Sequence, residues 1–408
     1  MKSNIKFENQ FLFIGAIGDK DTVAKLNEKG CAVSTAYNVQ RKMIDGLQML
    51  GYYSDTITAH ISPRDWKKNL VIDYKATNRN EKVTDVSVKF LNIPLVDKII
   101  KSTKIGKYAR KWVEGKESPY IFVYALSSCL LRGAIEAKKR NKKCRIIAIV
   151  PDLPEYMSNN NSKVYRLLKA IDRKIINNYL KFIDGFVLFA EPMKEKLDIN
   201  NRPYVVVEGI MKKIEKDLYV KQILSRQKKS KKIIMLSGNL DREEGIMLLL
   251  KAFSQIPNQD YELWFTGNGN CVEHIKECQR RDKRIKYFGY IKSYEKFLKL
   301  QQQASVFVLM VPKTNKKSAY YFPSKLMEYL ATGGQVACYK LQCIPKEYDQ
   351  YLEYFPDDFE KLPGKLIELC ERSPKEIYQK AYDRYEFIDS KGAEKQMKKV
   401  VNLLKQII

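Results

Sequence analysis

The sequence predicts an α/β protein with two doubly wound domains, each built on a parallel sheet. Apolar runs of strand length alternate with longer amphipathic stretches almost from end to end, which is typical of parallel α/β layers. The alternation stops at a polar, basic connector at 212–232 and then begins again. A chain of 408 residues is also too long for one ordinary core, so two domains of roughly 200 residues each are expected.

The first half of the chain is expected to form an N-terminal domain, residues 1–209. It opens with the apolar run FLFIGAIG, and each later strand is a similar short apolar run. The helices between them repeat apolar residues at three- and four-residue spacing. The expected strands are 11–18, 54–60, 120–125, 145–150, 185–190 and 204–209, and the expected helices are 34–50, 99–116, 127–141 and 163–182.

The second half repeats the pattern and is expected to form a C-terminal domain, residues 210–385. Tandem doubly wound domains place the carboxyl ends of both sheets across a cleft, where ligands bind. The charged tail is expected to be helical, and its last part, about 386–408, to pack back on the N-terminal domain. The expected strands are 232–238, 261–267, 284–289, 306–312 and 335–340, and the expected helices are 244–255, 271–280, 293–302 and 323–332.

The stretch YYFPSKLMEYLATGG has the residues of an anion site at the start of a helix. Pro323 suits the first helical position, and the free N–H groups of Ser324 and Lys325 with the helix dipole favour a phosphate. Glu328 lies on the same face as Ser324, where its carboxylate can accept hydrogen bonds from a vicinal diol. Gly333 is expected to end the helix in the left-handed conformation. A phosphate beside a diol describes a nucleotide, although a capped helix with a surface Glu explains the same residues.

Further motifs follow in order along the chain, among them a Gly pair and Ile-Pro-x-Glu-Tyr at 344–348. Together with FPSK and MEY they closely resemble the nucleotide-sugar site of family-4 glycosyltransferases of the GT-B fold, particularly bacterial members that build capsular and exopolysaccharides. The resemblance is strongest over 232–350. It also covers LSGNLDREEGIMLLLKAF (236–253), LWFTGNGN (263–270), IKYFGYI (285–291), IVPDLPEYM (149–157) and STAYNVQRKMIDGLQMLGY (34–52).

The resemblance implies the GT-B architecture, an α/β fold of two Rossmann-like domains facing a cleft, with the acceptor on the N-terminal side and the nucleotide-sugar on the C-terminal side. It also implies a role for each matching residue. Glu328 would bind the donor ribose, Ser324 and Lys325 the diphosphate, and Gly238 would let backbone approach that diphosphate. The other implied site residues are Gly267, Tyr290 and Ile291 around the nucleobase, Gly15 and Gly18 in a loop facing the donor, and Asp152 facing the reacting sugar or acceptor.

Three positions depart from the broader family pattern. Many relatives have Arg after the Gly at 238 and Lys before the Gly at 245, where this chain has Asn239 and Glu244. A Glu eight residues before the ribose-binding Glu is replaced by Tyr320. The leaving diphosphate needs a cation or a donor in the transition state, which Arg242 or Lys325 can supply, and Arg242 is the preferred candidate.

The implied activity is transfer of a hexosyl-type sugar from a nucleotide-diphosphate sugar, with a UDP-sugar favoured, to a lipid-linked or other saccharide acceptor of cell-surface polysaccharide synthesis. The resemblance implies that the reaction retains the anomeric configuration and that the donor's own phosphate oxygen takes the acceptor proton. It also implies that neither a cofactor nor a metal is required. If the reaction were inverting, Asp152 would be the general base. The alternative is a non-catalytic GT-B subunit that binds a partner glycosyltransferase or a glycan.

The net charge of +27 indicates either a negatively charged partner or a surface with many solvated cations. Residues 101–150 alone contain 13 Lys or Arg against three Glu. In the basic segment 99–116, apolar residues interleave with Lys101, Lys104, Lys107, Arg110 and Lys111, so it can lie as an amphipathic helix on an anionic membrane. A solvated surface helix explains it equally, and the motifs that would indicate nucleic-acid binding are missing from the sequence.

The remaining composition favours a cytoplasmic protein, peripheral on the inner face of the cell membrane. The first ten residues do not resemble a signal peptide, and the apolar runs fall short of the roughly 20 residues that span a bilayer. The eight cysteines lack the dense spacing of a disulfide-rich secreted domain. Cys271, His274 and Cys278 share a helix face but lack the fourth ligand of a structural zinc site.

Overall fold

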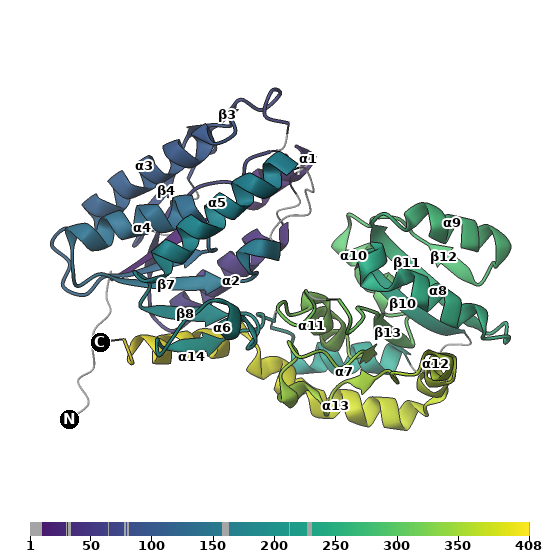
Figure 1. Ribbon diagram of the computed structural model, residues 1–408. Coiled ribbons are helices and arrows are strands. Elements are labelled where there is room, and N and C mark those ends of the chain that lie inside the picture. Colours follow the sequence, from purple (N-terminus) through teal and green to yellow (C-terminus); the bar gives the residue numbers. More distant parts are fainter. Residues whose placement is uncertain are drawn as a thin grey trace, which may run out of the picture. The chain divides into compact units, whose positions relative to one another are not determined.

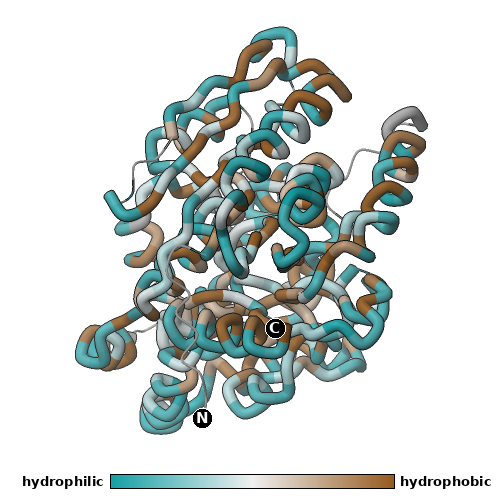
Figure 2. Tube along the Cα trace, turned by 90° about the vertical axis from the view of Figure 1, so that its left-hand side faces the viewer, coloured by the Kyte–Doolittle hydropathy of each residue, from teal (hydrophilic) through white to brown (hydrophobic). Residues whose placement is uncertain are grey.

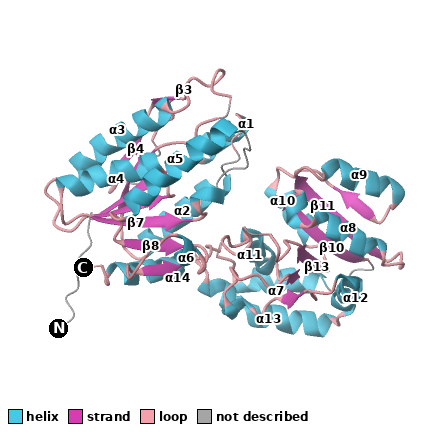
Figure 3. Cartoon of the chain, in the orientation of Figure 1, coloured by secondary structure: helices cyan, strands magenta, loops and turns pink. Residues whose placement is uncertain are grey.

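The computed structural model consists of two compact units, an N-terminal unit of Met1–Ile210 with Ala393–Ile408 and a C-terminal unit of Met211–Gly392 (Figure 1). Each unit contains a parallel sheet flanked by helices, with the strands drawn in magenta in Figure 3. The predicted α/β class is therefore confirmed. The structure describes residues 10–29, 31, 34–63, 65–76, 79, 81–156, 163–211, 213–226, 231–315 and 317–407.

The sheet of the N-terminal unit has the strand order β4-β2-β1-β6-β7-β8-β9, and every neighbouring pair is parallel. Its central strands are continuous apolar runs because helices cover both faces of such a sheet. A short antiparallel pair, β3 with β5, lies outside it. The strands are β1 (Phe11–Gly15), β2 (Ser54–Thr58), β3 (Val71–Ile72), β4 (Asp85–Ser87), β5 (Phe90–Leu91), β6 (Tyr120–Tyr124), β7 (Arg145–Val150), β8 (Gly185–Leu188) and β9 (Tyr204–Val206).

The helices of the N-terminal unit include one from the far end of the chain, α14, which packs against α2. Gly46 allows this close approach, because a Cβ there would lie 2.5 Å from the backbone oxygen of Ala393. The Gln396 side chain also donates to the Gly209 carbonyl at 2.8 Å. The helices are α1 (Lys20–Glu28), α2 (Ser34–Met49), α3 (Val96–Trp112), α4 (Ser128–Arg140), α5 (Lys163–Leu180), α6 (Met193–Lys196) and α14 (Ala393–Leu404).

The sheet of the C-terminal unit has the order β12-β11-β10-β13-β14-β15, again with every neighbouring pair parallel. The chain moves outward from β10 to β11 and β12 and then returns to the other side of β10. This reversal is the switch point at which doubly wound sheets bind ligands. The strands are β10 (Lys232–Asn239), β11 (Tyr261–Asn268), β12 (Ile285–Tyr287), β13 (Val306–Leu309), β14 (Gln335–Cys338) and β15 (Glu353–Tyr354).

The helices of the C-terminal unit are amphipathic and close over a core that contains Leu249, Phe253 and Leu366. Hydrophobic and hydrophilic residues alternate along the helices in Figure 2, as expected for elements with one buried side. The helices are α7 (Lys216–Arg226), α8 (Ile246–Ser254), α9 (Val272–Arg281), α10 (Tyr294–Gln301), α11 (Ser324–Ala331), α12 (Leu362–Glu371) and α13 (Pro374–Ser390).

Two segments differ from what the sequence predicts. The basic connector contains a helix, α7, which is fixed by the fully buried Tyr219 and Ile223. The segment 99–116 forms most of α3, and part of its apolar side, including Ile105 and Ala109, is fully buried in the contact with α4. Ile99 and Tyr108, by contrast, are 60% and 40% exposed.

Candidate functional site

The C-terminal unit places its predicted site residues at the carboxyl ends of β10 and β11 and at the start of α11. α11 is held there by Tyr329, which is fully buried and stacks on Phe307 with ring centroids 4.5 Å apart. The Tyr329 hydroxyl accepts a hydrogen bond from the Ser237 backbone N–H at 2.8 Å. The first turn of α11 therefore lies beside the last residues of β10.

Lys325 and Gly238 share this space. The Lys325 ammonium donates a hydrogen bond to the Ser237 carbonyl, and a Cβ on Gly238 would lie 1.5 Å from Lys325 Nζ. Gly238 also has φ of 103°, which L-residues with side chains avoid. Burial lowers the pKa of Lys325 to about 8, against the opposing effect of Glu244 and Glu328. The residue at 238 must therefore be Gly for the ammonium to reach the strand end.

Glu328 and Ser324 lie on one exposed face of α11, four residues apart. The charge of Glu328 is close enough to Lys325 to affect its pKa. The helix begins at Ser324, because Pro323 has ψ of 97° and is the N-cap, so the predicted start was one residue early. Gly333 has φ of 75°, and its predicted left-handed conformation is confirmed.

Glu244, not Arg242, is the residue of the β10–α8 loop that faces Lys325. Burial raises the pKa of Glu244, and Lys325 partly offsets this effect. The Asn239 amide lies 3.5 Å from the Glu244 carboxylate. Arg242 is exposed, and its backbone N–H donates to the Asn270 side-chain oxygen at 2.9 Å. The positive charge of its guanidinium lowers the pKa of the Cys271 thiol and so partly offsets the effect of burial. The signal for Glu244 in the sequence was its place where relatives have Lys.

The predicted nucleobase border lies on the β11 side of the same edge. Gly267 is the register partner of Gly238, and its N–H donates to the Gly289 carbonyl at 2.9 Å. The Thr266 hydroxyl donates to the same carbonyl at 2.6 Å. This turn projects Tyr290, which is 65% exposed, followed by the half-buried Ile291.

The N-terminal unit brings Gly15, Gly18 and Asp152 to the carboxyl edge of its own sheet. Gly15 ends β1 and Asp152 follows β7, with β6 between them. A Cβ on Gly15 would meet the Gln40 amide oxygen at 2.1 Å, and that oxygen accepts from the Ala16 N–H at 2.8 Å. Burial raises the pKa of Asp152.

A buried His60 under the β1–α1 loop was not selected from the sequence. Its Nδ1 lies 2.8 Å from the Tyr37 hydroxyl. The Tyr37 ring also leaves no space for a side chain at Gly18, because a Cβ added there would lie 2.9 Å from the ring. The His60 Nε2 has no hydrogen-bond partner among the described residues. Burial lowers the pKa of His60 to about 4, so the ring is neutral at pH 7. The feature of the sequence that could have identified His60 is its position two residues after the end of β2.

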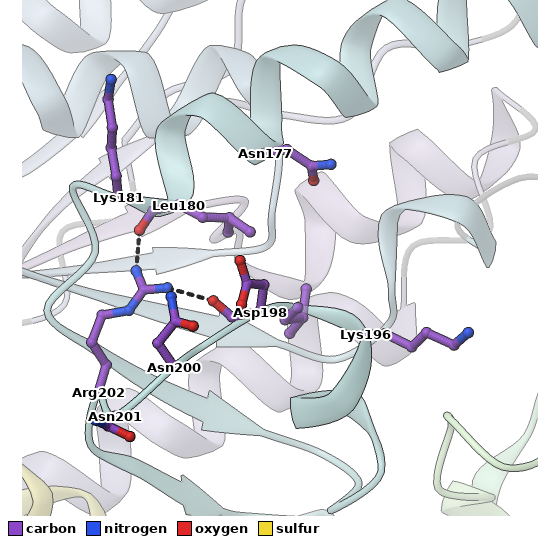
Figure 4. Close-up of a pocket in the computed structure, with 9 residues that line it drawn as sticks. Asn177, Leu180, Lys181, Lys196, Asp198, Asn200, Asn201 and Arg202 are labelled. Carbon is purple, nitrogen blue, oxygen red and sulfur yellow. Dashed lines mark hydrogen bonds between the residues drawn. The ribbon is translucent and has the colours of Figure 1, made fainter.

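A cavity of about 640 Å³ lies elsewhere, at the amino edge of the N-terminal sheet (Figure 4). Its wall includes Arg202, whose guanidinium donates to the Leu180 carbonyl and, at 2.8 Å, to the Asp198 carbonyl. The first bond satisfies a carbonyl at the end of α5, and the second satisfies one just after α6. Because doubly wound sheets bind ligands at the carboxyl edge, this cavity is not the candidate site.

The described residues contain no cluster of three or more His, Cys, Asp or Glu side chains arranged to hold a metal ion. All eight cysteines lie within the described part of the chain and are free thiols. In the described residues, no helix is long and apolar enough to cross a membrane.

Comparison with known proteins identifies the fold. Residues 231–371 match the family model described as Glycosyl transferases group 1. No curated protein sequence matches the chain.

Solved structures resemble the chain over nearly its whole length. A lipopolysaccharide outer core galactosyltransferase, WaaB, in its apo form has a TM-score of 0.64 at 12% identity and covers 98% of this chain and 99% of its own. The trehalose 6-phosphate synthase of Burkholderia multivorans has a TM-score of 0.61 at 11% identity, covering 98% of both chains. Anabaena HepE in complex with UDP has a TM-score of 0.62 at 12% identity, covering 97% of this chain and 100% of its own. The chain thus has the GT-B fold, and its residues 231–371 are similar to the glycosyltransferase group 1 family.

Proposed function

We propose that the protein transfers a hexosyl sugar from a nucleotide-diphosphate sugar, with UDP favoured as the nucleotide, to a saccharide acceptor, with retention of configuration. The observation that carries this proposal is the Lys325 ammonium held over Gly238 at the end of β10. It lies at the switch point of the sheet, with Ser324 and Glu328 exposed on the adjoining helix face. A cation, free helix N–H groups and a carboxylate one turn further match a diphosphate followed by a ribose.

In this proposal the chain acts mainly through electrostatics and orientation. Lys325 and the start of α11 stabilise the charge that develops on the leaving diphosphate, and Arg242 remains the second candidate cation. The donor's phosphate oxygen takes the acceptor proton on the same face, so a protein base is not required. Asp152 and the Gly15–Gly18 loop orient the acceptor hydroxyl and the reacting sugar. Neither a metal nor another cofactor is part of the mechanism.

The acceptor in this proposal is a lipid-linked saccharide of cell-surface polysaccharide synthesis of the capsular or exopolysaccharide type, used at the inner face of the membrane. The net charge of +27 supports a location at an anionic surface. The family-4 resemblance of the FPSK and MEY segments supports the same class of pathway.

The test is release of nucleotide from a panel of UDP- and GDP-sugars, with isolated membranes as the acceptor. Lys325→Met and Glu328→Gln are expected to lower kcat/KM by about a hundredfold or more, because each removes a contact to the donor. Glu273→Gln, an exposed carboxylate on α9, is the matched control and should retain full activity. NMR of the product's anomeric proton reports retention. Equal turnover by all three variants would reject this site.

A specific observation favours one alternative, a non-catalytic GT-B subunit that binds a partner glycosyltransferase or a glycan. Asn239 and Glu244 stand where relatives have cations, and the Glu244 carboxylate faces Lys325. Such a subunit would bind a nucleotide without turnover, and only an added partner glycosyltransferase would restore transfer.

A further inference from the structure

The loop between β10 and α8 is fixed by backbone contacts. Its Asp241 carboxylate accepts a hydrogen bond from the Asn270 N–H at 2.8 Å, which joins it to the loop that follows β11. Gly245, with φ of 77°, packs against the end of β13, because a Cβ there would lie 2.1 Å from the Met310 backbone oxygen. The Glu244 N–H donates to the Asp241 carbonyl at 3.0 Å. The backbone of Glu244 is therefore held on both sides.

Groups from α11, from β10 and from the loop itself affect the charge of the Glu244 carboxyl. The Lys325 ammonium on α11 attracts it, and the Asn239 amide at the end of β10 lies 3.5 Å from its oxygen. Asp241 and Glu243, on the same loop, repel its negative charge. Burial has the largest effect and raises the pKa of Glu244, and Lys325 with Asn239 offsets only part of that effect. A proton therefore binds this carboxyl more readily than it binds an ordinary Glu.

The other titratable groups of α11 near this carboxyl do not add a positive charge. The Tyr329 hydroxyl is neutral, because burial raises its pKa. Glu328 is an acid whose charge acts on Lys325. Lys325 is therefore the cation that Glu244 would share with an incoming diphosphate.

A bound diphosphate would change the preferred state of Glu244. The diphosphate of a nucleotide sugar is negatively charged, and a like charge nearby disfavours an ionised carboxyl. It would also take up the attraction of Lys325 that the free carboxylate uses. A neutral carboxyl has an O–H group that can donate a hydrogen bond to a phosphate oxygen. Protonation therefore converts Glu244 from a group that repels the donor into one that can bind it.

We infer that Glu244 binds the donor as a neutral carboxylic acid, donating a hydrogen bond to a diphosphate oxygen while Lys325 supplies the positive charge. The proton comes from the solvent when the donor enters and returns to the solvent when the nucleotide leaves, so this residue consumes no proton over a turnover. The inference rests on the proposed function and deepens it by naming a further donor-binding residue.

The experiment is titration calorimetry of the full-length protein with UDP-glucose, without an acceptor, in phosphate-free buffers of different ionisation enthalpy. The pH is kept below 7, where Lys325, with a pKa of about 8, is already charged and a UDP-sugar has no titrating phosphate group. The dependence of the heat on the buffer gives the number of protons taken up. The wild type should take up about half a proton or more per donor bound, whereas Glu244→Gln should take up none.

Glu244→Met separates a hydrogen bond from the mere removal of a repelling charge. Gln and Met both remove the charge at similar size, but only the Gln amide can donate a hydrogen bond. Glu244→Gln should therefore bind UDP-glucose about tenfold or more tightly than Glu244→Met, because a hydrogen bond to a charged group is lost in the latter. Equal melting temperatures show that both variants are folded. Glu243→Gln, which changes the exposed neighbouring carboxylate, is the matched control and should take up protons as the wild type does.

The outcomes separate this inference from the proposed function. Wild-type protein that binds UDP-glucose without proton uptake would overturn the inference and leave the donor site standing. Uptake that persists in Glu244→Gln, or equal affinity of the Gln and Met variants, would overturn it as well. Absence of UDP-glucose binding by the wild type would reject the proposed UDP-sugar site, and the inference with it.

Discussion

Lys325 and Glu244 are close enough for the charge of each to affect the pKa of the other, and this interaction sets the electrostatics of the candidate site. An isolated buried ammonium is costly, and the neighbouring carboxylates of Glu244 and Glu328 offset part of that cost. The same Glu244 carboxylate would repel an incoming diphosphate. The charge of the site therefore depends on pH through both Glu244 and Lys325.

Donor affinity should fall in two steps as the pH rises. Burial raises the pKa of Glu244, so its carboxyl becomes a repelling charge only as the pH rises through a pKa above the ordinary value for Glu. The pKa of Lys325 is lowered to about 8, so the attracting cation is lost above that pH. Titration calorimetry with a UDP-sugar measures both steps, and it avoids the terminal phosphate of UDP, which titrates near pH 6.

Glu244→Gln should remove the acid step and raise affinity at neutral pH by about threefold or more, while the step near pH 8 remains. Asp241→Asn, in the same loop, serves as the charge-matched control and should keep the acid step. An acid step that persists in Glu244→Gln would assign it to another group.

His60 provides a second titrating residue, one that acts on stability. Its pKa is lowered to about 4 in the folded chain from an ordinary value of 6.5, because burial disfavours the charged ring. Unfolding then takes up a proton at pH values between these two. Stability from the neutral ring is complete above pH 6.5 and is lost as the pH falls towards 4, by about 3 kcal/mol in total.

His60→Gln should show a shallower loss of stability between pH 6.5 and 4 than the wild type in urea unfolding. His274, the other histidine of the chain, is exposed, and His274→Gln should follow the wild-type curve. Parallel curves for His60→Gln and the wild type would show that this ring does not carry the pH dependence.

At the scale of elements, the contact between α2 and α14 joins residues far apart in the chain. Gly46 leaves no space for a side chain, since a Cβ would lie 2.5 Å from the Ala393 carbonyl oxygen and 2.7 Å from Met397 Cγ. α14 buries Met397, Val400 and Leu404 in return. The close packing of α14 against α2 therefore depends on the absence of a side chain at Gly46.

Gly46→Leu should destabilise the N-terminal unit by about 1–3 kcal/mol, because the contact is with backbone that cannot move without unseating α14. Thermal unfolding and the rate of proteolysis within 393–408 measure the effect. Gly364→Ala in α12 is the control, because a Cβ there meets nothing within 4 Å. An unchanged melting temperature for Gly46→Leu would contradict the packing described.

At the scale of the whole molecule, the two units divide the candidate residues between them, each set at the carboxyl edge of its own sheet. Gly238, Gly267, Lys325 and Glu328 belong to the C-terminal unit, whereas Asp152, with Gly15 and Gly18, belongs to the N-terminal unit. This division predicts that nucleotide binding stabilises the two units unequally.

UDP at a hundred times its dissociation constant should stabilise the folded state by about 2.7 kcal/mol, if the unfolded chain does not bind it. Hydrogen exchange should slow most in β10 and α11 and less in β1 and β6. The Lys325→Met protein under the same conditions is the control and should show little protection. Protection confined to the N-terminal unit would place the nucleotide elsewhere.

Local patterns predicted much of the fold and part of the site. Strands such as β10 and β11 are short apolar runs with a glycine as the next-to-last residue, and Gly333 follows a helix as a left-handed residue. Such features depend on neighbouring residues alone. α7 was missed because its buried Tyr219 and Ile223 are scattered among charged residues, and only the contacts of the folded unit show that they are core.

The amino-acid order by itself determined the alternation of strands and helices, the α/β class and the chemistry available at the start of α11, because each follows from the spacing of residues close together in the chain. The tertiary structure decided which side of each helix is covered. On α3, Ile105 and Ala109 are buried but Ile99 is exposed. On α5, Ile176 and Leu180 are buried but Leu167 and Ile171 are exposed. The tertiary structure also decided that Glu244, rather than Arg242, faces Lys325. Burial and electrostatic interaction depend on groups brought together from distant parts of the chain. The periodicity of the sequence does not identify those groups.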